Sequence, residues 1–556
     1  MVKECAHVPI VTIYYNRIQK LLKQNVPIDR VIEALPYLGL DLEEKGEDYV
    51  KVEYNPNRPD FSTDYGIARA LNGLFGFEKG APIYDVEYEG IKVFVDDSVK
   101  GIRPYIVSLV VKGLSLDDET IRQMITMQED LHAGIGRKRR KVSIGIHNLD
   151  VIHPPLTYTT VPPDFRFVPL NHTKPMSMEE VLRETDVGRE YGGIVAGFDR
   201  YPIIIDARGE VLSFPPIING ELTRVTTFTK NLLIDITGTD LKAMENSLAI
   251  LAATFHDAGG RLKSVEIVYS DGSMLTPDMA PTHMPIDLNL IRRLLGLNLS
   301  ESEVKECLER SRISVMKDND GTKAVIPRYR VDIIHPVDLV EEVVIGYGVY
   351  NLTPKLPRGN IMGRFDEGLA RLDRVRDVLT GFGLIEVMNF SLVSREVLYD
   401  KVGRRERRVL RVESPRTKEH EVLRDQLLPS LIFVASKNLH EEYPQRIFEV
   451  AKVCIPDDRK RSRVREEYHV AVLIAHAEAN YSEAKSLLTA FVQQAFNKRV
   501  ETKPVNHYMF TAGRVAEVIV DGKKLGYLGE VHPKVLNNFD LRVPAVAFEL
   551  NLELLD

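Results

Sequence analysis

The first 80 residues alternate between helical and strand patterns. Apolar residues recur three and four positions apart within 18–22, 31–35 and 67–74, which is the spacing of an amphipathic helix. Residues 49–54 alternate apolar and polar positions as a half-buried strand does, and the Asn- and Pro-rich stretch 55–60 then breaks the pattern. We therefore predict a small α/β module over residues 1–90.

A longer region with many short apolar runs follows. Runs at 105–111, 142–146, 203–205 and 232–236 predict strands, and two helical patterns lie at 117–132 and 240–256. Strands interspersed with helices of this length are typical of a mixed α+β domain. We place this domain at residues 91–272.

Residues 273–355 form a compact unit in which helical patterns dominate. A helix is predicted at 288–295, and Ser300 with Glu303 forms a capping box that opens a second helix. Residues 329–334 alternate as a strand does, and a further helix begins near Asp338. Two helices followed by a strand and a helix favour a winged-helix-like or similarly small binding fold.

The last region, residues 356–556, begins with an amphipathic helix at 369–379. Six strand patterns follow, at 386–392, 408–412, 447–453, 469–474, 514–520 and 546–550. Interleaved helices and hairpins indicate an antiparallel α+β domain. The whole chain is therefore predicted to be a multidomain α+β protein.

Composition narrows the class of protein. The 556 residues are 44% hydrophobic and 28% charged, which is typical of a globular protein, and no apolar run is long enough to cross a bilayer. The first residues lack the apolar stretch of a signal peptide, and the three cysteines are far apart, so we expect a cytoplasmic protein. The net charge of -7 offers no global attraction to nucleic acid.

Four carboxylates, Asp332, Asp338, Glu341 and Glu342, are close together where the predicted strand meets the predicted helix. Residues three and four apart share a helical face, so the last three can converge, and an all-oxygen group suits Mg²⁺. The alternative is that Asp338 caps the helix and the glutamates complement its dipole. On spacing alone, capping is the better interpretation.

Eight segments together carry a family resemblance. The chain resembles the β subunit of phenylalanyl-tRNA synthetase, of the archaeal and eukaryotic type, and the matching segments follow the order of that family over nearly the whole sequence. They are Tyr54 to Gly76, Gly136 to Asp150, Leu212 to Thr226, Leu233 to Asp240, Ile326 to Gly348, Leu423 to Leu431, Tyr443 to Val450 and Gly526 to Phe539.

The resemblance implies a function and partners. It implies a subunit that supports ATP-dependent attachment of phenylalanine to tRNA(Phe), together with an α subunit in an α₂β₂ heterotetramer. ATP is then a substrate of the assembled complex. The resemblance also matches Asp332, Asp338, Glu341 and Glu342 with a Mg²⁺ site shared with the α subunit.

The resemblance further implies that the last domain has a class II synthetase-like antiparallel core. A working core needs arginines that clamp the phosphates of ATP. Arg424 lies near the place of the first clamp, but the closing segment offers Glu549 and Glu553 in place of the required glycines and arginine. We therefore expect this domain to be catalytically silent, with the aminoacylation site in the α chain.

The 91–272 domain is where the family hydrolyses tRNA that carries tyrosine by mistake. The candidate pocket residues are Ser213, Asn219, Glu221, Thr223 and Asp235, the first four on a loop with two prolines and a glycine. The local alternative is that the serine and asparagine are ordinary turn residues. No histidine lies in this loop, so an activated water is the expected nucleophile.

Three basic clusters, at 137–141, 404–408 and 459–465, are candidates for contacts to a phosphate backbone, although most such runs are solvated loops. Two other functions stay open on the sequence. One is a freestanding metal-dependent hydrolase that uses the four carboxylates. The other is a non-catalytic nucleic-acid-binding scaffold, which the net charge does not favour.

Overall fold

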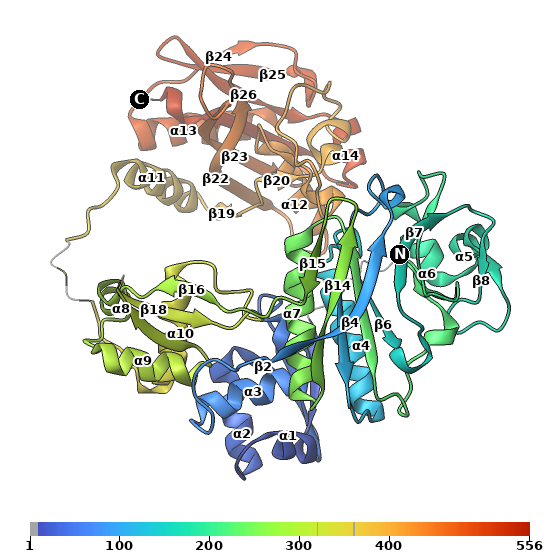
Figure 1. Cartoon of the computed structure of the whole chain (residues 1–556). Helices are drawn as coiled ribbons and strands as arrows, with labels where there is room; N and C mark the ends of the chain where they lie inside the picture. Colours follow the sequence, from blue (N-terminus) through green and yellow to red (C-terminus); the bar gives the residue numbers. More distant parts are fainter. Residues whose placement is uncertain (1–8, 320, 358, 360–361, 556) are drawn as a thin grey trace. The chain divides into compact units, whose positions relative to one another are not determined.

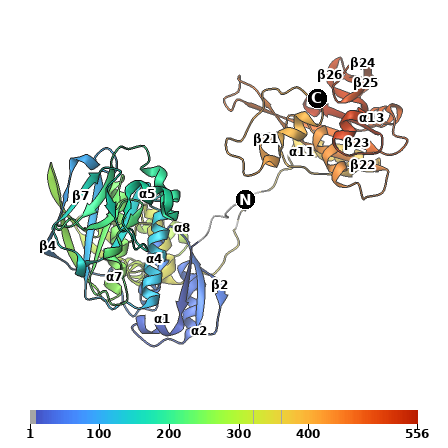
Figure 2. The ribbon, with the colours of Figure 1, turned by 90° about the vertical axis from the view of Figure 1, so that its right-hand side faces the viewer.

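Two compact units make up the chain, Met1–Leu356 and Pro357–Asp556, and Figures 1 and 2 trace both in sequence colours. The computed structural model describes residues 9–319, 321–357, 359 and 362–555. Within these residues, no helix is both long enough and apolar enough to span a membrane.

The first unit begins with a three-stranded antiparallel sheet in the order β1-β3-β2. Its elements are β1 (Ile10–Tyr14), α1 (Tyr15–Leu21), α2 (Ile28–Ala34), β2 (Leu40–Lys45), β3 (Tyr49–Tyr54) and α3 (Asp64–Leu74). The buried positions of β3, Val50 and Val52, join Leu71 of α3 in one apolar core. Thr63 caps α3 by accepting a hydrogen bond from the Gly66 N–H. The helices and the strand predicted for this region are confirmed.

A ten-stranded sheet forms the centre of the first unit, in the order β12-β11-β10-β7-β4-β14-β5-β13-β6, with β15 paired to β14. Only the pairs β14–β4 and β4–β7 are parallel. The strands are β4 (Val86–Val95), β5 (Tyr105–Lys112), β6 (Val142–Asn148), β7 (Leu156–Val161), β10 (Tyr201–Ile205), β11 (Val211–Phe214), β12 (Ile218–Asn219), β13 (Leu232–Gly238), β14 (Arg261–Tyr269) and β15 (Gly272–Thr276). Helix α7 (Leu241–Asp257) packs on β5 and β13, and α4 (Asp118–Ala133) packs on β6, so that Met127 and Leu251 share a core with Ile234.

A small lobe lies beside β10 and β11. It contains β8 (Arg166–Phe167), β9 (Met176–Ser177), α5 (Met178–Glu184) and α6 (Asp186–Tyr191). Ser177 and Glu180 form a capping box at the start of α5. Met178 and Val181 pack on Phe214 of β11, which fixes the strand from which the candidate loop continues.

The first unit ends in a small domain with the sheet order β16-β18-β17. Its elements are β16 (Thr282–Pro285), α8 (Leu288–Leu295), α9 (Glu301–Arg310), β17 (Ser314–Asp318), β18 (Gly321–Ile326) and α10 (Pro336–Tyr347). The predicted strand at 329–334 is wrong, because β18 ends at Ile326 and a turn follows. The Arg330 N–H donates to the Pro327 carbonyl at 2.9 Å and the Val331 N–H to the Tyr329 carbonyl at 3.0 Å.

A seven-stranded sheet forms the second unit, in the order β19-β22-β23-β27-β26-β25-β24, antiparallel except for β19 with β22. Its strands are β19 (Ile385–Glu386), β22 (Gln445–Pro456), β23 (Val464–Ala475), β24 (Glu501–Pro504), β25 (Phe510–Val520), β26 (Lys523–Val531) and β27 (Ala545–Asn551). Helices α11 (Glu367–Gly381) and α13 (Tyr481–Phe496) share one apolar core with the sheet, and α12 (Leu428–Lys437) and α14 (Pro533–Asn538) share another. The predicted strand at 408–412 is wrong, since only an isolated bridge at Arg411 is found there.

Candidate functional site

Asp235 is an acidic residue in the middle of a fully buried strand. Every residue of β13 is buried, and Asp235 itself is 3% exposed. An ionised carboxylate in such a place is costly unless it is paired or hydrogen-bonded. The groups around Asp235 must therefore compensate for the burial of its charge.

His147 of the neighbouring strand β6 supplies that pairing. Its Nε2 lies 2.6 Å from Asp235 Oδ2, its Nδ1 lies 2.8 Å from Thr223 Oγ1, and its ring is fully buried. Because an ionised carboxylate only accepts hydrogen bonds, Nε2 is the donor of this hydrogen bond and Asp235 the acceptor. Both ring nitrogens are engaged, which makes His147 a residue that orients Asp235.

Gly145 creates the space for this pair. It stands opposite Asp235 in the β13–β6 ladder, and a Cβ at this position would lie 2.4 Å from Asp235 Oδ2 and 2.6 Å from His147 Nε2. Such contacts cannot be relieved without moving a buried, hydrogen-bonded pair of side chains. Glycine is thus required here by close approach.

Replacing Gly145 by alanine is expected to lower the free energy of unfolding by about 1–3 kcal/mol, as overpacking of a filled interior does. Urea unfolding followed by circular dichroism measures this, since the chain contains no tryptophan. Gly101→Ala is the matched control, because a Cβ there would meet no atom within 4 Å. Equal stability of the two variants would contradict the close approach.

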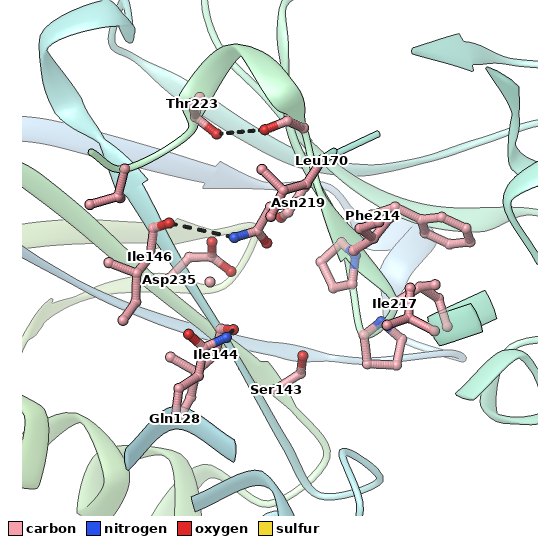
Figure 3. Close-up of a pocket in the computed structure, with 18 of the residues that line it drawn as sticks. Gln128, Ser143, Ile144, Ile146, Leu170, Phe214, Ile217, Asn219, Thr223 and Asp235 are labelled. Atoms are coloured by element: carbon pink, nitrogen blue, oxygen red, sulfur yellow. Dashed lines mark hydrogen bonds between the residues drawn. The ribbon is translucent and has the colours of Figure 1, made fainter. Parts of the chain in front are cut away.

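A cavity of about 430 Å³ has Asp235 in its lining (Figure 3). Its walls come from α4, β6 and the segment that runs from β11 to Val225. Asp235, Asn219 and Ser143 lie around the same hollow in Figure 3. The Ser213 hydroxyl is buried there, and among the described residues it has no hydrogen-bond partner. The second oxygen of Asp235, Oδ1, has no hydrogen bond within the part of the chain that the structure describes.

Arg139 fastens one wall of the cavity to another. Its guanidinium donates to the Ile217 carbonyl at 2.9 Å and to Glu129 Oε1 at 2.8 Å, and it lies over the Tyr191 ring at 4.3 Å. Burial raises the pKa of Glu129, but hydrogen bonds from His132 and Arg139 outweigh this effect and the net pKa is lowered. The turn at 215–217 is thereby held against α4.

Four of the five predicted pocket residues meet at this cavity: Ser213, Asn219, Thr223 and Asp235 line it. Glu221 does not line it, because its carboxylate pairs with Arg224 at 2.8 Å and accepts from the Asn171 N–H at 2.8 Å. His147 is a residue of the site that the sequence pattern does not predict, because it lies on a strand away from the loop. The alternation of residues 142–148 puts His147 in phase with Gly145, but the pairing of β6 with β13 was needed to bring it to Asp235.

The four carboxylates of the predicted Mg²⁺ site do not converge in this structure. Asp332 and Glu342 both bind the guanidinium of Arg330, which donates to Asp332 at 2.9 and 2.7 Å. Asp338 accepts from the Ile334 and His335 N–H groups at 2.8 and 2.7 Å, and Glu341 is exposed. Within the described residues, no three His, Cys, Asp or Glu side chains are arranged to hold a metal. In this arrangement the residues do not fit a Mg²⁺ site.

Arg330 belongs to a larger buried network of charges. Arg58 pairs with Asp60 through two hydrogen bonds of 2.9 Å, and Arg69 contacts both Asp60 and Asp257. Burial raises the pKa of Asp60, but the charges of Arg58 and Arg69 outweigh it and lower the pKa to about 2. The network connects the amino-terminal module, α7 and the segment before α10.

In the second unit, the residues singled out by the sequence have structural partners. Arg424 is 1% exposed and binds Glu449 through two hydrogen bonds of 3.0 and 2.7 Å. Glu549 accepts from the Leu427 and Leu428 N–H groups and therefore caps α12. Glu553 accepts from the Tyr468 N–H at 3.2 Å.

Comparisons with known proteins give a consistent result. The family model for the phenylalanyl tRNA synthetase beta chain CLM domain matches residues 352–552, and that for the tRNA synthetase B5 domain matches residues 284–349. The phenylalanine–tRNA ligase beta subunit of Archaeoglobus fulgidus is 42% identical over 98% of both chains. That of Thermococcus kodakarensis is 40% identical over 92% of both chains.

A solved structure is also similar. It is a crystal structure of an N-terminal fragment of the phenylalanyl-tRNA synthetase beta subunit from Pyrococcus horikoshii, 37% identical, with a TM-score of 0.59. The match covers 61% of this chain and 99% of the fragment. The likeness therefore extends to folded structure as well as to sequence.

Proposed function

Because this chain belongs to the phenylalanyl-tRNA synthetase β-subunit family, and so is an aminoacyl-tRNA synthetase subunit, we propose that it works in an α₂β₂ complex. With the α subunit it supports the ATP-dependent attachment of phenylalanine to tRNA(Phe). In its own 91–272 domain it hydrolyses Tyr-tRNA(Phe). We propose that the chain is divided into four domains, which are this one and its neighbours 1–90, 273–355 and 356–556.

The observation that carries the editing proposal is the buried carboxylate of Asp235, which lines the cavity and is hydrogen-bonded to His147. Tyrosine differs from phenylalanine by one hydroxyl, and a synthetic site that merely excludes it discriminates weakly. A site built to hydrogen-bond that hydroxyl rejects phenylalanine strongly, because its buried polar groups would stay unpaired. Asp235, with one oxygen fixed by His147, suits this role.

The same contacts define the hydrolysis. Ser213 lacks a neighbouring base, and both nitrogens of His147 are engaged, so a covalent serine mechanism has no support in this cavity. Water therefore attacks the ester carbonyl, the bond to the ribose oxygen breaks, and the water proton passes to that oxygen. The polar groups of Ser213 and Asn219 orient the ester and the water.

The proposal is tested with the assembled complex and purified Tyr-tRNA(Phe). Deacylation is expected to be much faster than that of Phe-tRNA(Phe) under the same conditions, measured as release of labelled amino acid. Equal, uncatalysed rates for the two would contradict the editing function. Such a result would not bear on the proposed role in aminoacylation, which is measured in a separate assay.

We propose that the second unit has a class II synthetase-like core that does no chemistry. Its one arginine near the expected phosphate clamp, Arg424, is buried against Glu449 and unavailable to a nucleotide. Glu549 and Glu553 accept backbone N–H groups and add negative charge, which disfavours a triphosphate. The aminoacylation site is accordingly assigned to the α chain.

An exposed apolar segment next to β19 is the proposed contact with the α subunit. Ile385, Met388 and Phe390 are 68%, 95% and 78% exposed, at the outer strand of the seven-stranded sheet. Large apolar side chains gathered in this way are typical of a protein interface. A permanent complex of two different chains would cover them.

Substituting Met388 and Phe390 together by aspartate is therefore expected to prevent stable association with the α subunit, because two charges would be buried in an apolar contact. Co-expression followed by affinity purification of a tagged α chain measures it. Ile83→Asp, at a side chain that is 81% exposed in the first unit, is the control. Retention of the double variant at wild-type yield would place the interface elsewhere.

The Mg²⁺ site remains a proposal drawn from the family, at Asp332, Asp338, Glu341 and Glu342. Binding there requires Arg330 to release Asp332 and Glu342. If the assembled complex makes this change, calorimetric titration with Mg²⁺ will show a site that Asp338→Asn with Glu341→Gln removes. An identical titration of the variant would contradict it.

A further inference from the structure

Two basic segments, 50 residues apart in sequence, meet on the surface of the second unit. Residues 404–411 contain five arginines and one glutamate, and residues 457–465 contain four arginines, one lysine and two aspartates. Arg408 of the first segment binds Asp458 of the second through two hydrogen bonds of 2.5 and 2.7 Å. This ion pair holds the two positive segments next to each other.

The second segment is an ordered hairpin connection. It joins β22 to β23, and the Asp457 N–H donates to the Arg463 carbonyl at 3.0 Å. The Arg463 N–H then donates to the Lys460 carbonyl at 2.9 Å, and Arg463 itself adopts a left-handed conformation with φ of 56°. Its cations are therefore presented from a defined backbone.

Some cations of these segments serve the fold. Arg404 binds Asp425 through two hydrogen bonds of 2.6 Å, Arg411 binds Glu406, and Arg459 binds Asp457. Five others are exposed and have no acidic partner among the described residues. These five, which we call the basic surface, are Arg405, Arg407, Lys460, Arg461 and Arg463.

The composition of this surface favours a phosphate ligand over a protein surface. A stable protein interface has an apolar centre, yet Val412 is the one exposed large apolar side chain found in the described residues within two positions of either segment. Guanidinium groups match the oxygens of a phosphate in a bidentate way. The surface also opposes the net charge of the chain, -7, so it does not follow from a generally basic composition.

We propose that the basic surface binds the phosphodiester backbone of tRNA during aminoacylation. This inference rests on the proposed function, and it adds a nucleic-acid contact in the domain assigned no chemistry. The contact is independent of base sequence and weakens with salt, because it releases counterions from the backbone.

The test uses variants of the assembled α–β complex in which pairs of positively charged side chains are replaced by neutral glutamines. Arg405→Gln with Arg407→Gln, and Lys460→Gln with Arg461→Gln, are measured for tRNA(Phe) binding between about 50 and 200 mM salt. Each pair is expected to reduce the slope of log affinity against log salt by about one to two. Arg499→Gln with Lys503→Gln is the control. Its residues are exposed, have no acidic partner in the described chain, and lie at the β24 end of the sheet, away from β22 and β23.

Two further readouts separate the possible failures. Pyrophosphate exchange driven by phenylalanine and ATP needs no tRNA and is expected to be unchanged in all variants. The proposal would be overturned if the two variant pairs gave the same salt slope as the control pair. It would also be overturned if the variants lost the α subunit while the complexes that remain kept the wild-type slope. A wild-type complex that exchanges pyrophosphate but binds no tRNA would instead reject the proposed function.

Discussion

Replacing Asp235 by asparagine is expected to slow deacylation of Tyr-tRNA(Phe) by about a hundredfold, while aminoacylation with phenylalanine stays at its wild-type rate. A hydrogen bond to a buried charged group contributes about 1.5–3 kcal/mol, which corresponds to roughly 10–150-fold. The same substitution also leaves His147 facing an amide in place of a carboxylate. Single-turnover deacylation by the assembled complex measures the loss.

Glu221→Gln is the matched control, because this carboxylate belongs to the same loop and pairs with Arg224 but does not line the cavity. It is expected to deacylate within about twofold of wild type, as changes at exposed ion pairs usually have small effects. Circular dichroism checks that Asp235→Asn is folded. A folded Asp235→Asn that deacylates at the wild-type rate would remove Asp235 from the site.

The sequence predicted much of this site because its strands are strongly apolar. The run Leu232 to Ile236 identified β13, and the single acidic residue in it, Asp235, is conspicuous for that reason. The sequence did not predict His147 as a site residue, because a histidine on an alternating strand has no distinctive local signal. The pairing of β13 with β6 brings His147 within hydrogen-bonding distance of Asp235.

The predicted strand at 329–334 failed for a related reason. The charged residues of this alternating pattern, Arg330 and Asp332, turn inward. Tyr329 is also buried, and the Arg69 guanidinium lies over its ring at 3.9 Å. A buried ion pair in a turn and a half-buried strand give the same pattern of letters. The spacing of the four carboxylates likewise does not show that Arg330 binds two of them.

Replacing Arg330 by methionine is expected to lower the free energy of unfolding of the first unit by about 3–5 kcal/mol. Removing one partner of a buried ion pair leaves the other charges buried without compensation. Arg330 is 4% exposed and Glu342 is 5% exposed, so water cannot replace the lost hydrogen bonds without rearrangement. Urea unfolding at pH 7, followed by circular dichroism, measures the change, with the exposed Arg293→Met as control.

The pH dependence distinguishes this electrostatic loss from a simple loss of packing. Burial raises the pKa of Asp332, but the charge and hydrogen bonds of Arg330 outweigh it and the net pKa is lowered. A lowered pKa adds stability that is complete above the unfolded value and is lost as the pH falls through the folded value. The difference between wild type and Arg330→Met should therefore shrink below about pH 4, where an unpaired Asp332 takes up its proton. A packing defect would give a constant difference, and Mg²⁺ that restored the variant at pH 7 would show that the freed carboxylates bind the ion.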